Sequence, residues 1–169
     1  MGLACKAGWG LSAILAGVIA VGGYRIFVGG NTVPYADGRT VVLLNSDERN
    51  RVLGEMRALL EGAKGIVQAS AAGDMATVAA EARAVGMAAA EAESPAMMAK
   101  LPGDFLTLGM SAHQAMDDLA DMAEGGAEPM EVLKALGEAM DVCTGCHAGY
   151  RLGVEGVDDR PGDGQGAGG

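Results

Sequence analysis

The pattern that most constrains this chain is a nearly unbroken succession of apolar residues at helical spacing. From Val52 onwards, apolar side chains recur three or four residues apart, which gives each segment one apolar face. Strands are disfavoured, because only 4% of the residues are aromatic and Ala, Met and Leu carry most of the apolar content. Residues 46–152 are therefore predicted to form an all-α domain, an antiparallel four-helix bundle.

Capping residues divide this domain into four predicted helices. Asn45 with Glu48 three residues later forms a capping-box pattern, Gly73 ends the first helix, and Asp74 caps the second. The first helix lies between Asn45 and Gly73, and the others span residues 75–93, 104–123 and 130–152. The predicted core-facing stripe of the first helix is Val52, Leu53, Met56, Leu59, Leu60, Ala63, Ile66 and Val67. That of the fourth is Leu133, Leu136, Met140, Cys143, His147 and Tyr150.

The segments on either side of the domain differ from it in composition. Residues 1–30 contain the uncharged stretch Leu11–Tyr24, which fits a signal peptide cleaved after Gly22 or an uncleaved anchor from about Trp9 to Val28. We expect the anchor, an N-terminal apolar helix, and both interpretations predict export. Residues 31–45 are predicted to be a linker with a short apolar patch. Residues 153–169 form a tail rich in Gly and Asp that is expected to be disordered.

The motif that carries chemistry is Cys-Thr-Gly-Cys-His at residues 143–147, near the end of the fourth predicted helix. Cys-x-x-Cys-His is the attachment pattern of c-type haem. On a helix, two such thiols can reach the vinyl groups on one edge of a porphyrin, and the imidazole can then bind the iron. A redox-active thiol pair would need a preceding strand and a parallel sheet. A structural zinc site would have only His113 as a fourth ligand. The motif therefore predicts one covalent haem c.

The longer stretch CTGCHAGYR, ending at Arg151, resembles the C-terminal signature of the class II cytochromes c, the group of cytochrome c′ and its low-spin relatives. In that family, Cys-x-x-Cys-His-x-x-Tyr-Arg ends the fourth helix of a bundle. The resemblance covers Asp47 to about Arg151; the N-terminal apolar segment and the glycine-rich tail depart from it. It implies the following cofactor-binding residues: Cys143 and Cys146 as thioether attachments, His147 as proximal iron ligand, Tyr150 beside the ring and Arg151 near a haem propionate.

The residue on the other side of the iron decides the chemistry. In the family, this position near the start of the first helix holds methionine in low-spin electron carriers. It holds an apolar residue, often leucine, in five-coordinate gas-binding proteins. Met56 and Leu53 both lie at the matching place. We expect Met56 to ligate the metal, although it is also one of 11 methionines suited to filling a core. If Leu53 covers the iron instead, the protein binds NO or CO. His113, expected to be half-exposed, is the bis-histidine alternative.

The net charge and the remaining residues limit which partners and functions are expected. The net charge is −10 with no basic stripe, so nucleic acid is not expected. No nucleophile–base pair or paired catalytic carboxylates stand out, so an electron carrier is expected rather than an enzyme. The acidic residues Asp117, Asp118, Asp121 and Glu124 are either a solvated face or a guide for a basic redox partner. A haem subunit of a larger membrane oxidoreductase and a homodimer stay open. The expected location is the periplasmic side of the bacterial inner membrane, anchored there, or the periplasm if the signal is cleaved.

Overall fold

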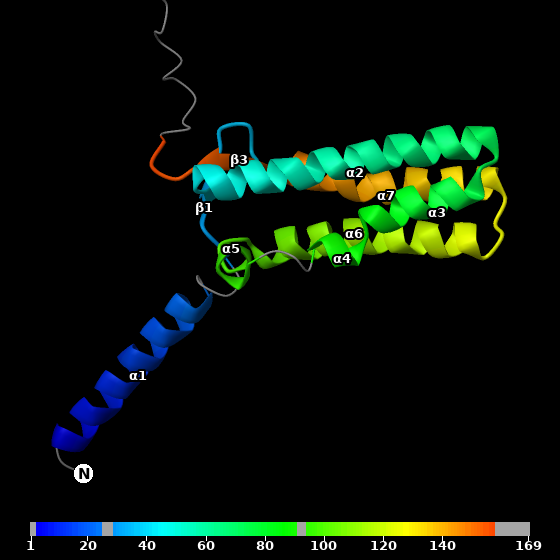
Figure 1. The fold of residues 1–169 in the computed structure, drawn as a ribbon. Coiled ribbons are helices and arrows are strands. Elements are labelled where there is room, and N and C mark those ends of the chain that lie inside the picture. The colour runs from blue at the N-terminus through cyan, green and yellow to red at the C-terminus, as the bar shows by residue number, and fades with distance from the viewer. Residues whose placement is uncertain (1–2, 25–28, 91–93, 158–169) are drawn as a thin grey trace, which may run out of the picture.

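A computed structural model describes residues 3–24, 29–90 and 94–157 and is mostly helical, with one small three-stranded sheet (Figure 1). The helices are α1 (Leu3–Tyr24), α2 (Ser46–Ala72), α3 (Met75–Ala84), α4 (Met87–Ala90), α5 (Pro95–Met98), α6 (Gly103–Glu124) and α7 (Pro129–Gly149). The strands are β1 (Thr32–Pro34), β2 (Thr40–Leu44) and β3 (Tyr150–Val154). The prediction of a helical chain is confirmed, and that of an all-α chain misses the sheet.

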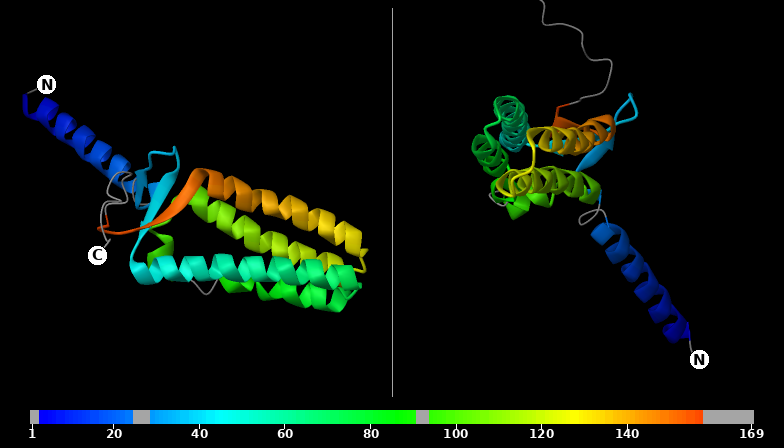
Figure 2. Two further views of the ribbon diagram at one scale, coloured as in Figure 1. Left: turned by 90° about the horizontal axis from the view of Figure 1, so that it is seen from above. Right: turned by 90° about the vertical axis from the view of Figure 1, so that its right-hand side faces the viewer.

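The long helices lie alongside one another and form the main body of the molecule (Figures 1 and 2). α3 packs against both α2 and α6, and α7 packs mainly against α6. Their shared core consists of small and branched apolar side chains, among them Ile66, Val78, Leu119, Val132 and Leu136. Because alanines supply much of the remaining contact, the helices can approach closely. Burial of this apolar surface is what holds the helices together.

The buried stripe of α2 is narrower than the predicted one. Val52 and Ile66 are buried, as expected, and Met56 is half-buried. Leu60 and Val67, however, are 66% and 46% exposed, so their predicted core positions are wrong. Each follows a residue on the inner face, and one residue turns the side chain by about 100° around a helix.

The caps of α2 and α3 are where the sequence predicts them. The Asn45 side chain accepts a hydrogen bond from the Glu48 backbone N–H, and the Glu48 carboxylate accepts one from the Asn45 N–H, each at 2.9 Å. Gly73 ends α2 in the left-handed conformation, with a φ of 72°. The Asp74 side chain caps α3 by accepting from the Thr77 N–H. These contacts satisfy backbone groups that a helix end otherwise leaves unpaired.

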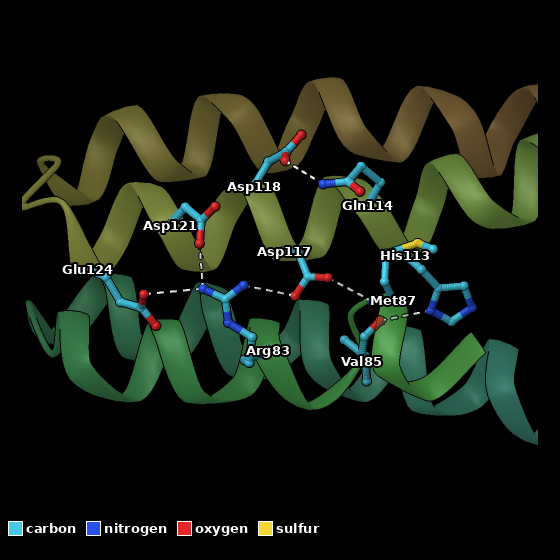
Figure 3. Close-up of polar contacts among 9 residues, drawn as sticks. All are labelled: Arg83, Val85, Met87, His113, Gln114, Asp117, Asp118, Asp121 and Glu124. Carbon is cyan, nitrogen blue, oxygen red and sulfur yellow. Dashed lines mark hydrogen bonds and ion pairs between the residues drawn. The ribbon is translucent and has the colours of Figure 1, made fainter. Parts of the chain in front are cut away.

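The second predicted helix breaks at Val85 and Gly86, and side chains of α6 hold the break (Figure 3). His113 Nδ1–H donates to the Val85 carbonyl at 2.9 Å, and the Asp117 carboxylate accepts from the Met87 N–H at 2.8 Å. A Cβ at Gly86 would lie 2.2 Å from Asp117 Oδ1, so the close approach requires glycine. Residues 91–93, the end of the predicted helix, lie outside the described residues.

The acidic residues of α6 are partly engaged within the molecule. The Arg83 guanidinium of α3 forms ion pairs with the carboxylates of Asp117, Asp121 and Glu124 (Figure 3). Asp118 accepts from the Gln114 side chain at 2.8 Å. Three of these four predicted surface carboxylates thus pair with the half-exposed Arg83.

The sheet occupies residues that were predicted to be a linker, the end of the fourth helix and the start of the tail. β2 pairs antiparallel with β1 and parallel with β3, with Thr40 opposite Tyr150 and Leu44 opposite Val154. Val41, Val42 and Leu44 are fully buried, so the linker prediction is wrong for residues 32–34 and 40–44. The fourth helix ends at Gly149 instead of Leu152, and the first two residues of the predicted tail belong to β3. Residues 158–169 of that tail lie outside the described residues.

α1 projects away from the other helices at the end of the molecule that carries the sheet (Figures 1 and 2). The large apolar side chains of α1 between Ile14 and Val21 are 59–67% exposed. None of the helices in the described parts of the chain combines the length and the apolar character that crossing a membrane takes. Residues 25–28, the end of the predicted anchor, lie outside the described residues.

Candidate functional site

The Cys-x-x-Cys-His motif forms the last two turns of α7. That helix begins with Pro129 at its first turn, where a missing N–H costs nothing. The Glu131 carboxylate accepts a hydrogen bond from the Glu128 backbone N–H at 3.0 Å. The helix ends because Tyr150 is extended, with a φ of −129° and a ψ of 155°, and starts β3. The motif therefore lies next to a junction between helix and sheet, at the same end of the helical body as the start of α2 (Figure 2).

A cavity of about 370 Å³ opens beside the motif. Its volume is within the range of about 300–1,000 Å³ that small-molecule and cofactor sites occupy. It is lined by Arg39, Arg49, Leu53, Met56, Phe105, Cys146, His147, Tyr150, Arg151 and Leu152. These residues come from the β1–β2 hairpin, α2, α6, α7 and β3.

Six of the seven predicted cofactor-binding residues line this one cavity. From α2, Leu53 and Met56 lie three residues apart on one helical face. The others come from the end of α7 and the start of β3: Cys146, His147, Tyr150 and Arg151. Cys143 is not among the lining residues and is exposed one turn earlier on α7. The arrangement thus joins a thiol, an imidazole and a thioether from distant parts of the sequence.

The predicted stripe of α7 is wrong in phase. Cys143 and His147 were expected to face the core with the leucines, but both are exposed, and Met140 is 46% exposed. The buried residues are Val132 and Leu136, and the inner face continues through half-buried Cys146. The true stripe therefore begins one residue earlier, about 100° around the helix. His147 still lines the cavity from the edge of this face.

Apolar packing supports the inner wall of the cavity. Cys146, Tyr150 and Met56 pack against a second core cluster, whose buried members are Val42, Leu44, Val52, Met97, Leu101 and Phe105. The ring of Phe105 meets that of Tyr150 edge to face, with centroids 5.4 Å apart and an interplanar angle of 85°. A wall of this kind fixes side-chain positions and limits solvent access.

Burial changes the acidity of two groups at the site. Desolvation, and then the neighbouring Cys143, raise the pKa of the Cys146 thiol above its ordinary value. Desolvation, followed by the charges of Asp104 and Cys146, raises the pKa of Tyr150. Both groups are therefore kept in their neutral forms at neutral pH.

His113 lies away from this cavity. It is 6% exposed, and its Nδ1–H is bonded to the Val85 carbonyl, so the expectation of a half-exposed histidine is wrong. It is not among the residues that line the cavity, and thus does not face His147 across it. Among the described residues, no group of three or more His, Cys, Asp and Glu side chains is arranged to hold a metal ion.

Sequence reasoning missed Arg39, Arg49, Phe105 and Leu152 as site residues. Arg49 could have been found, because it precedes Leu53 by four residues and Met56 by seven and so shares their face of α2. Phe105 reaches the cavity from the first turn of α6, a helix from which only His113 was considered as a site residue. Arg39 and Leu152 carried no usable signal, because the sheet that positions them was not predicted.

Comparisons of the chain with protein-family models, with curated proteins and with solved structures found no match.

Proposed function

We propose that this protein is a single-haem c-type cytochrome that carries one electron at a time between partner proteins. The observation that supports the proposal is the convergence of Cys146 and His147 of the attachment motif with Met56 of α2 on one cavity. In His/Met-ligated cytochromes c, an imidazole and a methionine thioether bind the iron, and two cysteines bond to the edge of the porphyrin. The motif alone predicts haem attachment. The presence of a methionine from α2 in the same cavity adds a candidate for the second iron ligand.

The residues of the site fit a haem in donor type and in surroundings. Cys143 and Cys146 would hold it through thioether bonds, His147 would be the proximal ligand and Met56 the distal one. The iron, when bound, supplies reversible one-electron oxidation and reduction. The chain's own contribution is the wall formed by Phe105 and its neighbours, which excludes water, while a methionine ligand favours a high reduction potential.

The proposal also includes the arrangement of the helices. We propose that α2, α3, α6 and α7 form an antiparallel four-helix bundle of the class II cytochrome c kind. In this bundle, the distal residue comes from the first helix and the attachment motif ends the last. The three-stranded sheet would then be an addition at the haem end of the bundle.

The test is maturation of the full chain in a bacterial host that attaches haem c. The expected product absorbs in the Soret region and is heavier than the polypeptide by one haem. Cys143→Ala and Cys146→Ala should each leave one thioether, which the pyridine haemochrome spectrum distinguishes from two. Cys5→Ala is the matched control and should leave the spectrum unchanged. A colourless wild-type product of unmodified mass would refute the proposal.

A second candidate function rests on Leu53, which lines the cavity beside Met56. If Leu53 lies over the iron, the site is five-coordinate and binds NO or CO instead of carrying electrons. Addition of CO to the reduced protein decides between the two functions. A Soret band that stays in place supports the carrier, and a band that moves supports the gas-binding protein.

We also propose that the protein works on the periplasmic side of the bacterial inner membrane, held there through α1. The uncharged, exposed residues of that helix support this placement. Membranes of the expressing host should retain the full-length protein after an alkaline wash. Recovery of the protein in the wash, with residues 1–22 missing, would support cleavage and a periplasmic form instead.

A further inference from the structure

The charge at the cavity is opposite to that of the whole chain. The chain has 22 acidic and 12 basic residues. Yet three arginines, Arg39, Arg49 and Arg151, line the cavity, and no Asp or Glu is found among its described lining residues. A site of this composition favours an anionic ligand.

The β1–β2 hairpin orients two of these arginines. Asp37 accepts hydrogen bonds from Arg39 Nε at 2.9 Å and from Arg39 Nη2 at 2.7 Å. The guanidinium carbon of Arg151 lies 3.9 Å from the centroid of the Tyr35 ring, in a cation–π contact. Both supporting residues belong to the hairpin connection, so a short piece of sheet fixes two cationic side chains before any ligand binds. Such ordering lowers the entropy that binding costs.

The third arginine has an unused donor. Arg49 Nε is buried and has no hydrogen-bond partner among the described residues. Buried donors are nearly always paired, because an unpaired one loses its bonds to water and gains nothing in return. An acceptor bound in the cavity would remove this penalty.

We propose that Arg39, Arg49 and Arg151 form a carboxylate-binding site in the cavity, and that the hairpin exists there to complete it. Guanidinium groups suit carboxylates, because they combine a delocalised positive charge with several N–H donors. Arg39 already uses Nε and Nη2 to bind Asp37, so a ligand would meet the other side of its guanidinium. The inference rests on the proposed function, since a haem in the cavity would present its propionate carboxylates to these arginines. A free dicarboxylate has the same chemistry and is the other source of such a ligand.

The test uses the full chain produced without haem attachment and kept reduced. It is titrated with ferric protoporphyrin IX and, separately, with the dimethyl ester of that porphyrin, which has no free carboxylate. We expect the wild-type chain to bind the free acid at least about tenfold more tightly than the ester. The double variant Arg39→Gln/Arg49→Gln should lose this preference while binding the ester as before. Arg57→Gln is the matched control, because Arg57 is exposed on α2 and does not line the cavity.

Circular dichroism melting shows whether each variant is folded. If the double variant fails to fold, Arg39→Gln alone should reduce the preference, since Arg39 lies at the surface hairpin, away from the buried core clusters. Equal binding of acid and ester by the wild-type chain would overturn the proposal, as would a preference that survives in the variants.

A calorimetric titration with succinate separates this inference from the proposed function. If neither porphyrin binds but succinate binds and the double variant loses it, the carboxylate site stands and the haem proposal fails. If neither the porphyrins nor succinate bind, both proposals fail.

Discussion

Met56 and Leu53 are the two residues on which the proposed haem chemistry depends. They lie three residues apart on α2, both half-buried, and both line the cavity that contains His147. A thioether and an isobutyl group fill similar volumes, so packing alone would tolerate either one next to a metal. Only the thioether can bind iron. The difference between an electron carrier and a gas-binding protein is therefore a matter of one side chain.

Substitution of Met56→Leu is expected to convert a low-spin, six-coordinate spectrum into a high-spin spectrum that shifts with CO, since leucine offers no donor. Met122→Leu is the matched control: Met122 packs against the core of the helical body and not at the cavity, so its loss should leave the spectrum as it was. Optical spectra of the oxidised and reduced haem protein provide the measurement. An unchanged spectrum in Met56→Leu would show that Met56 is not an iron ligand.

The two motif thiols are expected to differ in reactivity before haem attachment. Cys143 is exposed, whereas burial raises the pKa of Cys146 and leaves less of the reactive thiolate at a given pH. In a Cys5→Ala chain at about pH 8, iodoacetamide should therefore modify Cys143 several-fold faster than Cys146. Peptide mass analysis over time measures the two rates, and the urea-unfolded chain serves as the control, in which the rates should converge. Faster modification of Cys146 in the folded chain would contradict the burial seen here.

At the residue scale, sequence reasoning found the motif and its partner helix but not the direction of each side chain. Met56, Cys146 and His147 were predicted as site residues from spacing and resemblance alone, and all three line the cavity. The inner face of α7 was misplaced by one residue, because leucine and alanine occur all around that helix. The apolar stripe is then ambiguous, and only the packing against α6 decides which side is buried.

Among the elements, the break between α3 and α4 depends on α6. Gly86 allows Asp117 to reach the Met87 N–H, and the same carboxylate pairs with Arg83. Local sequence could not reveal this break, because alanine-rich residues on both sides favour a continuous helix. The contact that ends α3 comes from a residue on another helix, which explains why the second predicted helix was too long.

Gly86→Ala is expected to destabilise the protein by roughly 1–3 kcal/mol, because the added methyl would displace Asp117 and leave the Met87 N–H unpaired. Gly137→Ala on α7 is the control. Its Cβ would meet nothing within 4 Å, so helix propensity should make that variant as stable as the wild type or more so, by up to about 1 kcal/mol. Urea unfolding followed by circular dichroism measures both. Equal stabilities of the two variants would mean that the break does not depend on this contact.

The same carboxylate should make stability depend on pH. The Met87 N–H, and then Arg83, hold the pKa of Asp117 below its ordinary value of 3.8. A lowered pKa in the folded state stabilises the fold above the unfolded-state pKa, and this contribution is lost as the pH falls through the folded-state pKa. Below about pH 4, the free energy of unfolding should therefore fall less steeply in Asp117→Asn than in the wild type.

At neutral pH, Asp117→Asn should be less stable by on the order of 1–3 kcal/mol. The neighbouring residue gives the control, because the Asp118 carboxylate pairs with Gln114 on the exposed side of α6. Asp118→Asn should follow the wild-type pH dependence. Parallel curves for wild type and Asp117→Asn would exclude the linkage.

On the scale of the whole molecule, the helices were predictable and the sheet was not. Caps and apolar periodicity are local signals, and they located α2 and α6 almost to the residue. β2 and β3 pair with each other although nearly the whole domain separates them in the sequence, with Thr40 opposite Tyr150. Each strand is too short to be recognised alone, and the patch at residues 41–44 reads equally well as an apolar stretch in a linker.

The sheet is expected to contribute to the stability of the folded core. Leu44→Ala should cost about 2–5 kcal/mol, since this fully buried side chain belongs to the cluster behind the cavity. Val33→Ala on β1 should change the stability by less than about 1 kcal/mol, because Val33 is 40% exposed. Thermal or urea unfolding compares the two. If Leu44→Ala unfolds with the wild-type midpoint, residues 31–45 behave as the linker first predicted.

The parallel pairing of β2 with β3 also bears on when the cavity can form during folding. α2 and α3 can associate early, because their contacts are local in the sequence. Arg151 and Leu152 reach their places only when β3 pairs with β2, a contact between distant parts of the sequence, so the wall they form is expected to close late. A ligand attached to Cys143 and Cys146 before that pairing would meet a motif that is still open.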